Sequence, residues 1–200
     1  MTMWPIEKWR IAAFTTVGIV VYTLLILLSN GFNEDNLRLL LRATARSSLL
    51  LFLLAFGATS MHLVWRNAAT AWTLKNRRYL GVSFAISHFI HLGFIVWLAM
   101  VYPEPFFSTT GLSFWIVGGA AYLFITAMAI TSFEMPRKWL GEKKWSLLHT
   151  TGGYLVLFVF FQAYVPKALM GDLFRMPFAA AILLVVVLRS YRIYRRKTQT

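Results

Sequence analysis

The chain has 200 residues, of which 58% are hydrophobic, and it carries 20 lysines and arginines against seven acidic residues. A hydrophobic share this high excludes an ordinary soluble domain. The sequence contains no cysteine, which excludes disulfides, thiolate metal sites, iron–sulfur clusters and cysteine nucleophiles.

Six stretches are apolar enough and long enough to cross a bilayer, which takes roughly 20 helical residues. We therefore predict an all-α membrane protein, with one domain over residues 1–200 formed by a bundle of six transmembrane helices. The N-terminal segment MTMWPIEKWR lacks a small-residue cleavage site and leads into a full span, so we expect no cleaved signal peptide. The predicted spans are residues 11–29, 47–65, 79–101, 112–133, 145–165 and 176–190.

The basic residues are unevenly distributed between the two sides of this predicted bundle. Fifteen of the 20 lie in the N-terminal segment, the second-to-third and fourth-to-fifth connections, and the C-terminal tail. Under the positive-inside rule these segments, and both termini, are cytoplasmic. Basic segments beside a bilayer meet anionic lipid headgroups, so the expected partner is the membrane and not nucleic acid.

All four histidines fall inside predicted spans, whereas the seven acidic residues lie in loops or at span ends. Ionisable groups in hydrocarbon are costly and mark functional sites. The lack of buried glutamate excludes a di-iron carboxylate site, and no H-E-x-x-H pattern indicates a zinc hydrolase. Histidines alone in apolar surroundings favour axial ligation of haem iron. The four are His62, His88, His91 and His149.

A second interpretation needs no haem. Histidines in membrane bundles also form interhelical hydrogen bonds with serine and threonine, and Ser60, Ser87 and Thr150 lie close to these histidines in the sequence. The chain would then be a small-molecule or proton transporter, or a membrane assembly partner. Depth along the helices, at ~1.5 Å per residue, favours one site in the cytoplasmic half or midplane for all four histidines.

Three stretches resemble the ferric reductase-like transmembrane domain family, and within it the haem-binding membrane subunit of the bacterial periplasmic methionine sulfoxide reductase system. They are RATARSSLLLFLLAF (42–56), RRYLGVSFAISHFIH (77–91) and WLGEKKWSLLHTTGGYLVL (139–157). The resemblance implies a six-helix cytochrome b in the bacterial inner membrane, with histidines on the third and fifth spans. Fuller members carry two histidines on each of these helices and hold two stacked haems.

In this chain His91 and His149 match the first histidine position of each helix, and the second positions are missing, because Gln162 stands thirteen residues beyond His149. The resemblance therefore implies one haem b, with these two histidines as axial ligands. His88 is the alternative to His91, and His62 has no counterpart and remains a candidate contact to the cofactor. Candidate partners of the haem propionates are Arg77, Arg78 and Lys144.

The expected function is electron transfer as a subunit of an oxidoreductase system, not as a complete enzyme. No G-x-G-x-x-G pattern marks a dinucleotide site. The expected donor is therefore a separate flavin or NAD(P)H reductase or a quinol, with any flavin or quinone supplied by the partner. The expected acceptor is a protein or small oxidant on the extracytoplasmic side.

Overall fold

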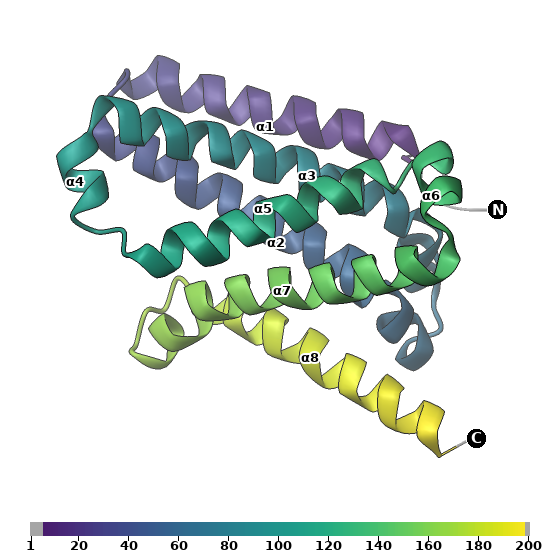
Figure 1. Cartoon of the computed structure of the whole chain (residues 1–200). Helices are drawn as coiled ribbons and strands as arrows, with labels where there is room; N and C mark the ends of the chain where they lie inside the picture. Colours follow the sequence, from purple (N-terminus) through teal and green to yellow (C-terminus); the bar gives the residue numbers. More distant parts are fainter. Residues whose placement is uncertain (1–5, 199–200) are drawn as a thin grey trace.

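The computed structural model describes residues 6–198, and this part of the chain contains helices and no strands, which confirms the all-α prediction (Figure 1). Residues 1–5, half of the segment examined for a signal peptide, lie outside the described residues. The helices are α1 (Trp9–Asn30), α2 (Glu34–Val64), α3 (Ala68–Val101), α4 (Pro103–Phe107), α5 (Leu112–Ile130), α6 (Glu134–Leu140), α7 (Glu142–Leu169) and α8 (Met176–Lys197).

Among the described residues, five helices are long and apolar enough to cross a membrane, and six if α5 and α6 are counted as one broken span. The predicted span 112–133 covers α5 and ends just before α6, which turns from the axis of α5 by 107°. The other five predicted spans each correspond to one long helix. The chain therefore has the helices of a multi-pass membrane protein.

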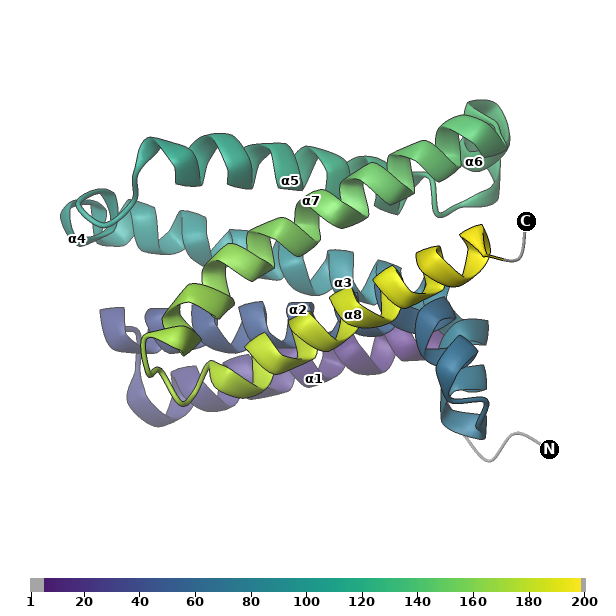
Figure 2. The same cartoon turned by 90° about the horizontal axis from the view of Figure 1, so that it is seen from below.

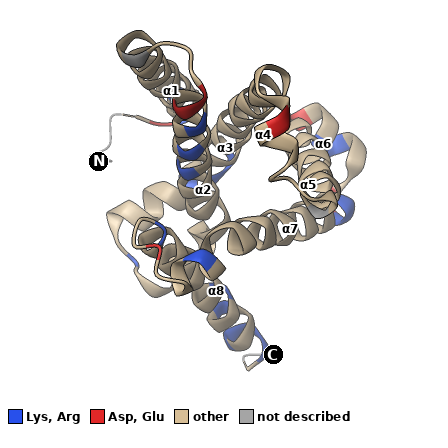
Figure 3. Ribbon diagram, turned by 90° about the vertical axis from the view of Figure 1, so that its left-hand side faces the viewer, with Lys and Arg blue, Asp and Glu red and all other residues tan. Residues whose placement is uncertain are grey.

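The long helices run side by side, with α4 at one end of the bundle and α6 at the other (Figures 1 and 2). Both ends of the described chain lie at the end where α6 is found. We call this the α6 end. Viewed along the bundle from the α4 end, α7 lies between α5 and α8 (Figure 3), and it packs against both.

The core lies where α2, α3, α5, α7 and α8 meet. Phe52, Phe84, Ile125, Phe160 and Ile182 are buried there, in one cluster. Large apolar side chains on the outer faces are exposed instead, including Leu28 (81%) and Leu123 (74%). Apolar side chains exposed on long helices are those that contact lipid in a bilayer.

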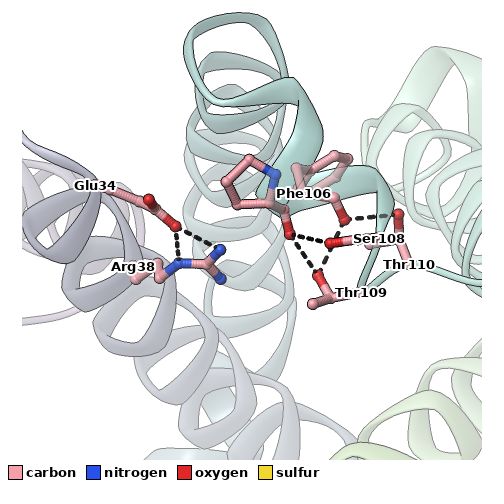
Figure 4. Close-up of polar contacts among 7 residues, drawn as sticks. Glu34, Arg38, Phe106, Ser108, Thr109 and Thr110 are labelled. Atoms are coloured by element: carbon pink, nitrogen blue, oxygen red, sulfur yellow. Dashed lines mark hydrogen bonds and ion pairs between the residues drawn. The ribbon is translucent and has the colours of Figure 1, made fainter.

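Helix α2 begins at Glu34, well before the predicted start at residue 47. The side chain of Asn33 caps it by accepting a hydrogen bond from the backbone N–H of Asn36 at 2.9 Å. Glu34 in the first turn also pairs with Arg38 at 2.7 Å, beside the turn that follows α4 (Figure 4). The cap and the ion pair extend the helix through a polar stretch that hydropathy alone assigns to a loop.

Candidate functional site

A cavity of about 470 Å³ opens between α2, α3, α5, α7 and α8, on the side of the core nearer the α6 end. Its walls carry four aromatic side chains and several hydroxyl groups, and its rim carries six basic side chains. No carboxylate is found among the described lining residues. The aromatic residues are Phe52, Phe56, Phe84 and Trp145, and the basic residues are Lys75, Arg77, Arg78, Arg137, Arg189 and Arg192.

His149 is the one histidine among the described lining residues. Its Nε2 atom lies 3.1 Å from the Thr131 hydroxyl, which donates its own proton to the carbonyl of Ala127 at 2.7 Å. With its proton on the Ala127 carbonyl, the Thr131 hydroxyl is free to accept from His149 in the tautomer that carries the proton on Nε2. Trp145 fixes the same region, because its ring centroid lies 4.5 Å from that of His149 and its indole N–H donates to the Thr131 carbonyl.

Two glycines that follow His149 allow α7 to approach its neighbours closely. A Cβ atom built on Gly153 would lie 2.4 Å from the Phe56 ring on α2. One built on Gly152 would lie 2.9 Å from Met128 and Phe124 on α5. Both distances are too short for any larger residue without a shift of these neighbours, so the two glycines allow the close contact of α7 with side chains of α2 and α5.

The rim cations differ in how they are neutralised. Lys75 pairs with Glu7, and Arg137 pairs with Glu142 and lies over the Trp145 ring. The other four rim cations take part in none of the ion pairs found among residues 6–198. One of them, Arg78, has a buried Nε atom without a hydrogen-bond partner. The rim therefore holds more positive charge than the protein balances locally.

His88 and His91 lie elsewhere, in a polar cluster between α2, α3 and α5. The Thr44 hydroxyl contacts His91 Nδ1 at 2.9 Å, and the Tyr122 hydroxyl donates to the backbone carbonyl of His88 at 3.1 Å. The two imidazole rings stack at 5.3 Å, and His88 also stacks on Tyr122 at 5.0 Å. The Nδ1 atom of His88 is buried without a hydrogen-bond partner.

Contacts across the bundle place this cluster and His149 at two different levels. On α5, Tyr122 contacts His88 and Thr131 contacts His149, and nine residues of helix separate these positions by about 13 Å. On α7, Phe160 contacts His88 and lies eleven residues beyond His149, about 16 Å along the axis. The third-helix histidines and His149 therefore lie at different levels along the bundle.

Some of the remaining predicted site residues line the cavity and others lie outside it. Arg78 lines the cavity, whereas Lys144 and His62 do not. His62 lies at the end of α2, where its Nδ1 atom is 3.1 Å from the Thr70 hydroxyl. The structure thus brings His149, Arg77 and Arg78 together at the cavity and leaves His62, His88, His91 and Lys144 outside it.

Arg189 and Arg192 on α8 also line the cavity, although the sequence analysis did not predict them as site residues. The sequence places them in a basic C-terminal tail. They are three residues apart, about one helical turn, and so share a face of the helix. Two arginines at this spacing, at the end of an apolar span, are the feature of the sequence that could have indicated a shared site. Which helix they face depends on how α8 packs, which composition does not reveal.

No family model matches the sequence, and no curated protein and no solved structure shows a significant similarity to it.

Proposed function

We propose that the protein is a membrane b-type cytochrome that transfers electrons and holds one haem in the cavity beside His149. The observation that carries this proposal is the composition of the cavity: one histidine, four aromatic rings and a basic rim in a single space between helices. Haem needs an imidazole for its iron, apolar walls for its ring and cations for its propionates.

The residues present fit these requirements on one side of the cofactor. His149 would serve as the protein ligand to iron, and Arg78 and Arg137 would neutralise the propionates at the rim. Phe52 and Phe84 provide apolar surface for the macrocycle. When bound, haem iron supplies one-electron redox chemistry.

The surroundings of His149 hold the imidazole in place before any cofactor binds. Thr131 accepts the Nε2 proton, and the Trp145 ring packs against the imidazole. These two contacts restrict rotation of the imidazole ring, which lowers the entropic cost of ordering the side chain when a cofactor binds. The basic rim lies at the α6 end, which we assign to the cytoplasm by the charge rule. A cytosolic reductase or a quinol would then donate electrons there, and an extracytoplasmic acceptor would receive them.

A second candidate function is favoured by a different observation. Three of the four histidines contact a threonine hydroxyl: His62 with Thr70, His91 with Thr44 and His149 with Thr131. Contacts of this kind serve helix packing without any cofactor. A haem-free transporter or assembly partner would contain such contacts and no chromophore.

The absorption spectrum of the protein, purified in detergent after expression with ample haem, separates the two functions. The cytochrome is expected to show a Soret band that shifts on dithionite reduction. A folded, colourless protein would contradict the cytochrome and favour the haem-free bundle.

Replacing His91 with alanine tests whether the two levels are independent. We expect the His91→Ala protein to keep the haem at the cavity, because the neighbouring His88 already lies roughly 13 Å from the level of His149 along α5, and His91 does not line the cavity. The measurement is the haem-to-protein ratio from the pyridine haemochrome spectrum. Loss of haem in this variant would restore the pairing of His91 with His149 and contradict the separation of the levels.

A further inference from the structure

We propose that Arg77, Arg189 and Arg192 form a binding site for the phosphate group of an anionic lipid, at the α6 end between α2, α3 and α8. The site adjoins the cavity but does not depend on haem. Its ligand is defined by chemistry: a phosphate that carries negative charge, attached to an acyl-chain body that lies in the bilayer.

Two of the three arginines reach the last turns of α2. Arg77 reaches from α3 to the Thr59 hydroxyl at 3.3 Å, and Arg189 reaches from α8 to the Phe56 carbonyl at 2.8 Å. Thr59 and Phe56 are three residues apart on α2, so the two guanidinium groups lie on one face of that helix. Arg192 lies one turn further along α8 and, like them, lines the cavity.

No carboxylate balances these charges. The ion pairs among the described residues leave all three arginines out. Arg189 and Arg192 are also partly buried. Like charges held close together in partly desolvated surroundings are unfavourable unless an anion joins them, and the planar guanidinium fork matches phosphate oxygens.

Two features favour a lipid as the source of the phosphate. The arginines lie near the ends of apolar helices, at the depth where the headgroup of a lipid in the adjacent leaflet would be found. Basic pockets between transmembrane helices on the cytoplasmic side bind anionic headgroups in this manner. Arg189 also has the Phe56 ring 3.6 Å and the Tyr154 ring 4.9 Å from its guanidinium carbon, which provides aromatic surface beside the charge.

Native mass spectrometry of the full chain, released from micelles containing equal amounts of phosphatidylglycerol and phosphatidylcholine, tests this site. We expect the wild-type protein to retain phosphatidylglycerol preferentially. The Arg192→Gln variant should reduce that retention about fivefold, and it removes no hydrogen bond to the described protein. The matched control is Lys138→Gln, which removes the same charge from an exposed position on α6 outside the cavity.

Equal retention of the two lipids, or an equal loss in Lys138→Gln, would overturn the proposal. A separate arm adds inorganic phosphate to lipid-free protein in detergent and follows thermal unfolding. Two results together would overturn the lipid as the source of the phosphate. Millimolar inorganic phosphate would have to stabilise the lipid-free protein, and it would also have to displace phosphatidylglycerol when added to the lipid-containing micelles. The His149→Ala variant, which tests the haem proposal, should retain phosphatidylglycerol normally, so failure of one proposal is distinguishable from failure of the other.

Discussion

The His149→Ala protein is expected to contain almost no haem, whereas wild-type protein prepared in parallel is expected to contain about one haem per chain. His149 is the one imidazole among the described residues of the cavity wall, and alanine offers no lone pair to iron. Loss of the sole protein ligand removes the coordinate bond that holds haem b in place. The measurement is again the pyridine haemochrome spectrum per mole of protein.

The matched control for this experiment is His62→Ala. His62 also contacts a threonine hydroxyl near the α6 end of the bundle, but it does not line the cavity. Both substitutions therefore remove a histidine–threonine hydrogen bond, and only one removes a candidate ligand. Haem retained in His149→Ala would contradict the ligand assignment, and haem lost equally in both variants would show that folding, not ligation, had failed.

Hydropathy predicted where the long helices lie, because a bilayer imposes one length and one polarity on every span. It did not predict the start of α2 at Glu34, which depends on the Asn33 cap and the Glu34–Arg38 pair. It also did not predict the sharp bend between α5 and α6. Caps and bends arise from a few specific side chains, and averaged hydropathy does not register them.

The arrangement of the histidines could be predicted only in part. The depth of each histidine can be counted from the nearest basic residue at the end of its span. The ends of a predicted span are uncertain by several residues, and that uncertainty allows all four histidines to share one site. Contacts between helices set the true levels: Thr131 lies beside His149, and Phe160 lies beside His88. Such contacts depend on how α5 and α7 slide against α3, a property of packed pairs of helices that no single segment encodes.

Gly153 is the position where we expect a single methyl group to cost the most stability. The Cβ atom of alanine would lie 2.4 Å and 2.8 Å from two carbons of the Phe56 ring. That ring cannot move freely, because Phe52 stacks on it at 5.1 Å and the Arg189 guanidinium covers it at 3.6 Å. Overpacking of this kind costs about 1–3 kcal/mol.

Thermal unfolding in detergent, followed by circular dichroism, is expected to show a lower midpoint for Gly153→Ala. The matched control is Gly119→Ala, where the added Cβ meets no heavy atom within 4 Å. Glycine is a poor helix former, by up to about 1 kcal/mol relative to alanine, so this control should be neutral or slightly stabilising. A fall in midpoint of the same size in both variants would mean that the close approach to Phe56 is not the cause.

A double-mutant cycle with Phe56→Leu isolates that close approach. Leucine has no counterpart of Cε2, the ring carbon nearest to the added methyl group, so Gly153→Ala should cost less in the Phe56→Leu background than in the wild type. Residues in direct contact typically show coupling of about 0.5–3 kcal/mol. Additive costs would instead place the effect of Gly153 in the helix backbone, and the narrow α2–α7 contact that bounds the cavity would then not depend on this glycine.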